Sequence, residues 1–467
     1  MRILVFHGYM LRGTGSNIYN VNLARALAKL GHEVHLLCQD RETKIEGVEI
    51  HNPDIGGLLP VYVTDPYEGF EVKTFPELSE EELDRYIEAN VAAVGDVAER
   101  AGGIDLALAN HLVMGPAILA RADVAPFAAK IHGSALEYTV KPHPRFLPYA
   151  REGMEAAQGV LVGSRHTAES LWAALPEVEE LREKTRLGPP GVDTEAFRPR
   201  ESGSDPAGSR SRGVPAGPDP DSRRRIVFVG KLIVSKGVDL LLAAWPLVRA
   251  EHPGAKLEVA GFGEYEEGLR RLLAALERGD LDDARKVALA GWGLEGGEEK
   301  PLPILSAFLA DPPAGYMEAA QDGAGSVEFI GRLEHDEVAE LLPGAEALVM
   351  PSTFPEAFGM VAAEAAACGA LPISAGHSGM LEVSRQLMEA LPEEVGRLTS
   401  FPVEAGAVEA IAERLNGWLA LPEAERASAR EALVETARRL WSWEGVARGV
   451  LAAASGQEPE SFPPSLQ

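Results

Sequence analysis

Hydrophobic positions along the chain fall into two alternating patterns. Short apolar runs, typical of buried strands, alternate with longer stretches in which apolar residues return every three or four positions, as on one face of a helix. This alternation favours an α/β fold of the doubly wound type, with parallel strands covered by helices on both faces. The runs that we expect to be strands lie at residues 2–6, 33–38, 104–109, 127–131, 159–163, 226–229, 257–261, 327–330, 347–350 and 371–374.

Two stretches interrupt this alternation and suggest how the chain is divided. Residues 199–224 are poor in apolar residues and rich in Gly, Pro, Ser and Arg, a composition typical of a flexible linker. Residues 279–325 are rich in Gly, Pro and acids, contain only short helical stretches, and are too long for an ordinary connection. We therefore expect two doubly wound domains, followed by a helix and a disordered tail. The expected boundaries are 1–198 for the N-terminal domain, 225–440 for the C-terminal domain with its insertion at 279–325, 441–455 for the helix and 456–467 for the tail.

The most informative stretch runs from Ser352 to Val383. It follows the buried run at 347–350, and Pro355 forces a loop before helical spacing resumes near Phe358. Gly369 can end this helix. The chain here predicts a strand, a loop and a short Ala-rich helix in direct succession.

Two acids mark this short helix. Glu356 precedes it in the loop, whereas Glu364 belongs to its second turn. Gly359 allows close approach of the backbone, and the free N–H groups of the first turn favour a diphosphate between the two acids. An ordinary amphipathic helix with two solvated acids explains the same spacing equally well.

This motif resembles a known family. The E-x7-E spacing from Glu356 to Glu364, with Ala357, Phe358 and Gly359 after the first acid and a glycine loop after the next strand, is similar to that of the retaining family-4 glycosyltransferases of GT-B architecture. The resemblance implies two Rossmann-like domains around a cleft, with the donor mainly on the C-terminal half and the acceptor mainly on the N-terminal half. It also implies that the helix at 441–455 crosses back to the N-terminal domain.

A basic pair in the second half fits the same family. Lys231 and Lys236 flank the passage from the strand at 226–229 to a helix, where two cations are electrostatically misplaced unless an anion sits between them. The G-K-x4-K-G spacing resembles the pair that holds the donor diphosphate, with Lys231 where many members have Arg. Arg332 and Leu333 resemble the segment that faces the nucleotide base.

His132 follows the strand at 127–131, at the strand end where ligands collect in open α/β sheets. A lone histidine is more often structural than catalytic. The HGS context resembles the family's active-site histidine, although Ala135 stands where many relatives have an acid. Glu137 is a candidate substitute for that orienting acid.

The N-terminal glycine loop carries two interpretations. Gly13 and Gly15 could bring backbone N–H groups against a phosphate, and with Asp40 after the second strand they permit a dehydrogenase-like dinucleotide site. Ile18 argues against a dehydrogenase, because the third glycine that lets helix and strand pack closely is absent. The resemblance assigns Gly15 to the donor phosphates.

Composition limits the partners. The chain has 44 Lys and Arg against 71 Asp and Glu, a formal net charge of -27, which repels nucleic acids and anionic membrane surfaces. The only two cysteines, Cys38 and Cys368, lie far apart in the sequence, and neither a secretory signal nor an apolar run of membrane-spanning length is visible. We expect a cytoplasmic protein without an integral membrane segment.

No metal or other cofactor is expected. Asp280 and Asp282 form a D-x-D pair, which in other glycosyltransferases coordinates a divalent ion, but a solvated turn or a helix N-cap explains it better. We therefore expect a nucleotide sugar as co-substrate and no metal.

The family resemblance thus predicts transfer of a hexosyl group from a nucleotide diphosphate sugar, most commonly a UDP-sugar such as UDP-glucose, to a hydroxyl acceptor with retention of configuration. A sugar-nucleotide epimerase, a dehydrogenase and a non-catalytic nucleotide-sugar-binding module are the alternatives. The roles implied are Lys231, Lys236 and helix amides for the diphosphate, Glu364 for the ribose, Glu356 with the backbone of Ala357, Phe358 and Gly359 for the donor sugar, and His132 near the anomeric carbon.

Overall fold

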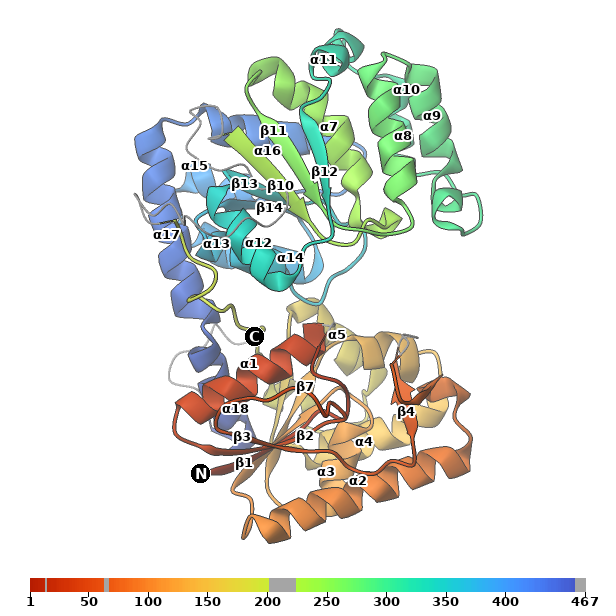
Figure 1. Ribbon diagram of the computed structural model, residues 1–467, viewed down its shortest axis with the longest axis vertical. Helices are drawn as coiled ribbons and strands as arrows, with labels where there is room; N and C mark the ends of the chain where they lie inside the picture. Colours follow the sequence, from red (N-terminus) through yellow and green to blue (C-terminus); the bar gives the residue numbers. More distant parts are fainter. Residues whose placement is uncertain (13–14, 63–66, 201–223, 458–467) are drawn as a thin grey trace. The chain divides into compact units, whose positions relative to one another are not determined.

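The computed structural model describes residues 1–12, 15–62, 67–200 and 224–457 (Figure 1). The chain forms two compact units. The N-terminal unit comprises Met1–Gly191 with Leu440–Gln467, and the C-terminal unit comprises Val192–Arg439. Most of the linker and tail expected at 199–224 and 456–467 lies outside the described residues. None of the described helices is long and apolar enough to cross a membrane.

The N-terminal unit is built on a parallel sheet of 7 strands in the order β3-β2-β1-β6-β7-β8-β9. The strand order reverses beside β1, which pairs with both β2 and β6, and this is the point where open α/β sheets bind ligands. A separate 2-stranded sheet joins β4 and β5. The strands are β1 Arg2–Phe6, β2 Glu33–Leu37, β3 Val48–His51, β4 Leu58–Val61, β5 Glu71–Thr74, β6 Leu106–Asn110, β7 Phe127–Ile131, β8 Gly159–Val162 and β9 Thr185–Leu187.

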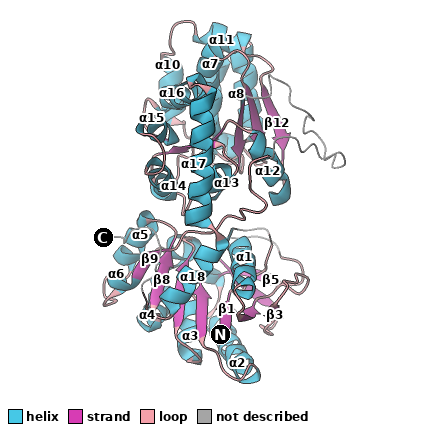
Figure 2. Ribbon diagram, turned by 90° about the vertical axis from the view of Figure 1, so that its left-hand side faces the viewer, coloured by secondary structure: helices cyan, strands magenta, loops and turns pink. Residues whose placement is uncertain are grey.

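Helices cover both faces of this sheet, each over its own apolar cluster. On one face α18 lies beside α1 and against β6, β7 and β8 (Figure 2). The C-terminal helix therefore crosses back to the N-terminal unit, as predicted. Ser79 caps α2 by accepting from the Glu82 amide at 3.2 Å. The helices are α1 Gly15–Lys29, α2 Glu80–Arg100, α3 Gly115–Ala122, α4 Leu147–Ala156, α5 Arg165–Ala174, α6 Leu181–Lys184 and α18 Trp443–Ala454.

The C-terminal unit repeats the architecture with a parallel sheet of 6 strands, ordered β12-β11-β10-β13-β14-β15. Both units are thus Rossmann-like, and the predicted fold class is confirmed. The strands are β10 Arg225–Val229, β11 Lys256–Ala260, β12 Val327–Gly331, β13 Ala347–Met350, β14 Leu371–Ala375 and β15 Ser400–Phe401. The helices are α7 Val238–Glu251, α8 Glu266–Glu277, α9 Leu281–Ala290, α10 Pro303–Ala310, α11 Tyr316–Asp322, α12 His335–Leu341, α13 Met360–Ala367, α14 Ser378–Met388, α15 Glu393–Gly396, α16 Ala407–Ala420 and α17 Glu423–Trp441.

The insertion at 279–325 is a packed helical element made of α9, α10 and α11. Phe308 and Tyr316 are buried and pack edge to face, and the Tyr316 hydroxyl donates to the Ala243 carbonyl of α7 at 2.8 Å. Asp280 caps α9 by accepting from the Asp283 amide at 2.9 Å. The N-cap interpretation of the D-x-D pair is therefore confirmed.

The sequence reading missed the short strands at the sheet edges and in the small sheet, namely β3, β4, β5, β9 and β15. Edge strands such as β3 are only partly buried, so their apolar residues do not form the continuous run that marks a central strand. Helix α1 begins at Gly15, so the second glycine of the N-terminal glycine loop already belongs to the helix.

Candidate active site

Three neighbouring strands of the C-terminal unit end at one edge of its sheet. β10, β13 and β14 lie side by side, and the loops after them carry the lysines and acids that the sequence singled out. Gly237 makes their close approach possible. It has a φ of +65°, and a Cβ there would lie 2.1 Å from the Pro351 carbonyl oxygen, so a larger residue would push the Lys236 loop away from the end of β13.

Lys236 and Glu356 meet directly at this edge. The Lys236 Nζ lies 2.5 Å from Glu356 Oε1, and the Ser352 hydroxyl donates to the same oxygen at 2.6 Å. Both charged side chains remain about a quarter exposed, at 27% and 20%. In this structure Lys236 is therefore paired with Glu356, and the diphosphate expected between Lys231 and Lys236 stays a prediction.

The backbone around Glu356 is held by the loop after β14. Its amide donates to the Ser378 hydroxyl at 2.9 Å, and its carbonyl accepts from the Gly379 amide at 2.8 Å. The His377 Nε2 donates to the Ser352 carbonyl at 2.9 Å. The sequence reading noted the glycine loop here but assigned no role to Ser352, His377 or Ser378.

Glu364 is held by a partner that the sequence reading missed. Its carboxylate is buried, with 5% of the side chain exposed, and Oε1 lies 2.9 Å from His335 Nε2. The hydrogen bond that His335 donates to Glu364 raises the pKa of His335. The alternative of two solvated acids on a plain helix is therefore wrong, because one acid is buried against an imidazole and the other is paired with a lysine.

The N-terminus of α13 lies between these two acids in the sequence. No side chain of the described residues caps it, and its first turn contains no acid. The first N–H groups of a helix have no partner within the helix, and together with the helix dipole they favour an anion. Of the flanking residues, Ala357 is exposed whereas Phe358 and Gly359 are buried.

The other predicted donor residues lie on loops after β10 and β12. Lys231 is exposed and forms no ion pair with any residue that the structure describes. Arg332 is exposed, pairs with Glu334 at 2.9 Å, and places its guanidinium over the Phe262 ring at 5.0 Å. Leu333 is half-buried beside it.

In the N-terminal unit, His132 follows β7 and joins a hydrogen-bonded network. Its Nε2 lies 2.8 Å from Asn110 Oδ1, and the Asn110 amide donates to Asn20 Oδ1 at 2.7 Å. Asn20 in turn donates to His7 Nδ1 at 3.0 Å. The orienting partner of His132 is thus Asn110. The candidate Glu137 instead contacts Lys141 and Ser170, at 2.6 and 2.5 Å.

Burial keeps the imidazoles of this network neutral. Desolvation lowers the pKa of His7 to about 4 and the pKa values of His111 and His132 well below their ordinary range. The His111 ring packs 4.8 Å from that of His132, and both of its nitrogens lack a hydrogen-bond partner among the described residues. Because His7 follows β1 and His111 follows β6, the rule that singled out His132 would also have found them.

Asp40, the acid on which the dehydrogenase interpretation depends, is not available to a dinucleotide. Asp40 is fully buried, and its carboxylate accepts from the backbone amides of Leu11, Glu42 and Thr43 at 2.8 to 3.2 Å. It therefore holds two loops together and is not free to bind a ribose. Gly15 opens α1, where an added Cβ would meet no described atom within 4 Å, and Gly13 lies outside the described residues.

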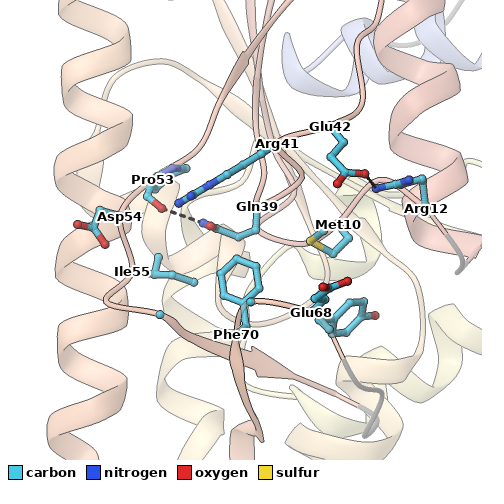
Figure 3. Close-up of a pocket in the computed structure, with 13 residues that line it drawn as sticks. Met10, Arg12, Gln39, Arg41, Glu42, Pro53, Asp54, Ile55, Glu68 and Phe70 are labelled. Atoms are coloured by element: carbon cyan, nitrogen blue, oxygen red, sulfur yellow. Dashed lines mark hydrogen bonds and ion pairs between the residues drawn. The ribbon is translucent and has the colours of Figure 1, made fainter.

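A pocket of about 560 Å³ opens in the N-terminal unit near the ends of β2 and β3 (Figure 3). Gln39 donates to the Pro53 carbonyl at 3.1 Å, and Arg12 pairs with Glu42 at 2.6 Å. The Arg41 side chain extends toward Pro53 on the opposite wall. The remaining lining residues include the acids Asp54 and Glu68 and the apolar or aromatic side chains of Met10, Ile55, Tyr67 and Phe70.

Comparison with known families agrees with this geometry. The model of Glycosyltransferase Family 4 matches residues 13–196, and two models of Glycosyl transferases group 1 match residues 223–295 and 318–439. The chain belongs to the family-4 glycosyltransferases of the group 1 type. The group 1 match at 318–439 contains Glu356 and Glu364, and the match at 223–295 contains Lys231 and Lys236.

Two similar proteins each match the chain over about half of their own length. The D-inositol 3-phosphate glycosyltransferase of Segniliparus rotundus is 30% identical over 275 residues, which are 58% of this chain and 46% of that protein. A GDP-mannose-dependent monoacylated α-(1-6)-phosphatidylinositol monomannoside mannosyltransferase of Corynebacterium glutamicum is 28% identical over 264 residues, 55% of this chain and 52% of the relative. The chain therefore spans about half the length of these two relatives.

Solved structures show the same GT-B fold. Anabaena HepE in complex with UDP has a TM-score of 0.58 at 15% identity, with 97% of this chain and 100% of that chain covered. Sucrose-phosphate synthase from Thermosynechococcus elongatus has a TM-score of 0.55 at 19% identity, with 96% of both chains covered.

Proposed function

We propose that the chain is a hexosyltransferase that uses a nucleotide diphosphate sugar as donor and a hydroxyl group as acceptor. The observation that carries the proposal is the Lys236–Glu356 pair beside the uncapped N-terminus of α13. A lysine and free helix amides at the carboxyl ends of parallel strands form an anion-binding site. Transfer of a hexosyl group from a nucleotide diphosphate sugar releases a nucleoside diphosphate, and this is the anion that such a site would stabilise.

Donor binding would exchange partners at Lys236. The donor diphosphate would replace Glu356 beside Lys236, with Lys231 as the second cation, and Glu356 would turn to the hydroxyls of the donor sugar with the backbone of Ala357 to Gly359. Glu364, held by His335, would accept hydrogen bonds from the ribose. Arg332 and Leu333, beside the exposed ring of Phe262, would face the base.

We propose that transfer retains the anomeric configuration. The bond from the anomeric carbon to the phosphate oxygen breaks, the acceptor oxygen bonds to the same face of that carbon, and the acceptor proton passes to the leaving phosphate. No residue then needs to act as nucleophile. His132 would serve as a neutral hydrogen-bonding group toward the donor sugar, since burial lowers its pKa.

We propose the pocket of Figure 3 as the acceptor site. Gln39, Arg41, Asp54 and Glu68 supply hydrogen-bonding groups, and Tyr67 and Phe70 supply aromatic surface, a combination that suits a polyhydroxylated acceptor. The names of the two relatives above mention inositol phosphate and phosphatidylinositol mannoside, so free and phosphorylated cyclitols belong in the first acceptor panel.

The test is a donor and acceptor panel. UDP-glucose is our preferred donor, and GDP-mannose is its direct competitor because a relative is named for it. We expect nucleoside diphosphate release that rises when an acceptor is added, and NMR of the product should show the donor's anomeric configuration. Turnover of donor alone to an isomeric nucleotide sugar would replace the proposal with an epimerase, and an inverted product would reject retention.

We further propose that transfer requires no metal and takes place in the cytoplasm. The cations above meet the diphosphate charge, so Mg²⁺ or Mn²⁺ added to EDTA-treated protein should not raise the rate. Both cysteines are free and buried, which suits a reducing compartment.

A further inference from the structure

A cluster of histidines and acids lies on the edge of the N-terminal sheet, apart from the residues discussed so far. β2 and β3 run parallel, with His35 opposite Glu49 and Leu37 opposite His51. Because side chains on a strand alternate between faces, Glu33 and His35 of β2 share one face with Glu49 and His51 of β3. The four side chains therefore gather on one side of the sheet edge.

The His35 imidazole is buried, the His51 imidazole is largely shielded, and the two carboxylates reach solvent. The side chains of His35 and His51 are 4% and 11% exposed, whereas those of Glu33 and Glu49 are 59% and 66% exposed. The two imidazole nitrogens are thus shielded from solvent, and the exposed Glu49 side chain can move toward them.

The distances match a single metal centre. His35 Nδ1 lies 3.1 Å from His51 Nε2, Glu49 Oε2 lies 3.6 Å from His35 Nδ1, and Glu49 Oε1 lies 3.7 Å from His51 Nε2. Ligand bonds of about 2.0–2.1 Å in a tetrahedral site place neighbouring ligand atoms roughly 3.3 Å apart. All three separations lie close to that value, so small movements of the Glu49 side chain complete the site.

Glu33 sets the orientation of His35. Its Oε1 accepts from His35 Nε2 at 3.2 Å, so the proton lies on Nε2 and the lone pair of Nδ1 points toward His51. A carboxylate that holds the second nitrogen of a histidine in this way is the usual outer partner in zinc sites.

We propose that His35, His51 and Glu49 bind one divalent transition metal ion of the Zn²⁺ type, with Glu33 as a positioning residue and solvent as the remaining ligand. The ion replaces the hydrogen bond between the two rings. The bound ion links β3 to β2. The segment after β3 contributes Pro53, Asp54 and Ile55 to the wall of the pocket shown in Figure 3. Metal binding therefore steadies one wall of that pocket.

The test is Zn²⁺ titration of the metal-free full chain by calorimetry, with Co²⁺ absorption as a report on the ligands. We expect one saturable Zn²⁺ site, a tetrahedral Co²⁺ spectrum, and a rise in Tm on Zn²⁺ addition. Glu49→Gln and His51→Gln should each weaken Zn²⁺ binding at least about tenfold, and Glu33→Gln about tenfold, in keeping with the effect of outer partners. Glu46→Gln, an exposed acid two residues before β3, is the matched control and should bind as the wild type does.

Two results would overturn the proposal. One is the absence of saturable Zn²⁺ binding to the wild-type chain, and the other is binding by Glu49→Gln and His51→Gln as tight as that of the control. Glu49 is mostly exposed, so its variant is expected to fold, and circular dichroism checks this independently. Nucleotide binding by the C-terminal unit is measured separately, so failure of the metal site leaves the transferase proposal untouched.

Discussion

The two units place polar side chains at the same edge of the same kind of sheet but handle charge in opposite ways. In the C-terminal unit, Lys236 pairs with Glu356 and His335 pairs with Glu364. In the N-terminal unit, His7, His111 and His132 lie among asparagines and aromatic rings, and burial keeps them neutral.

This difference indicates what each unit can contribute to a transfer reaction. A charge that is about a quarter exposed can exchange one partner for another at modest cost, because solvent screens it during the exchange. A buried neutral network cannot accept a new charge without a large desolvation cost, so it offers fixed hydrogen bonds instead. We infer that the C-terminal unit supplies electrostatic stabilisation of the leaving group and that the N-terminal unit supplies orientation.

The largest effect is expected at Lys236. Lys236→Ala removes the cation at the diphosphate site, so binding of nucleoside diphosphate should weaken about tenfold to a hundredfold and the transfer rate should fall about 10²–10³-fold. Calorimetry and a nucleoside diphosphate release assay measure the two quantities. Lys256→Ala, which removes an exposed lysine at the start of β11, is the control and should change neither. Unchanged affinity in Lys236→Ala would show that the diphosphate binds elsewhere.

The neutral network predicts a loss of stability in acid. The pKa of His7 is about 4 in the folded protein against an ordinary 6.5, so the unfolded chain binds more protons between these values. The His7 contribution is therefore complete above pH 6.5 and lost as the pH falls toward 4, and it amounts to roughly 3 kcal/mol of unfolding free energy.

Urea unfolding at a series of pH values tests this expectation. His7→Gln removes the titrating group, so the free energy of unfolding should fall less steeply with acid than in the wild type. His166→Gln changes an exposed histidine of α5 and should keep the wild-type slope. Equal slopes in His7→Gln and the wild type would mean that the network tolerates charge, and the contrast between the two units would fail.

Local patterns in the sequence predicted most of the fold and located several of the residues at the candidate site. The central strands are continuous apolar runs, and Asp280 and Ser79 are caps that act within three residues, so each could be located from its neighbours. Glu356 and Glu364 were found for the same reason, since the spacing of one acid in the loop before α13 and one within the helix is a local property.

The partners of these residues could not be found in this way. Lys236 and Glu356 are 120 residues apart, Glu364 and His335 are 29 apart, and His132 and Asn110 are 22 apart. Only the sheet order, which sets which strand ends lie side by side, brings them together. The partly exposed strand β3 was missed because its pattern is weak, and the histidine cluster that it carries was missed with it.

The smallest effect is expected at His335, where the direction of the pH dependence is opposite to that of His7. Glu364 raises the pKa of His335, so the stability that the pair contributes is complete below pH 6.5 and is lost as the pH rises through the raised pKa. With 43% of the His335 side chain exposed, the contribution should stay below about 1 kcal/mol. Comparing His335→Gln with His166→Gln, a change at an exposed histidine of α5, in urea unfolding from acid to alkaline pH isolates this contribution. A pH dependence in the His335 variant identical to that of the wild type would mean that Glu364 is held by its buried surroundings alone and that the His335–Glu364 ion pair does not contribute to stability.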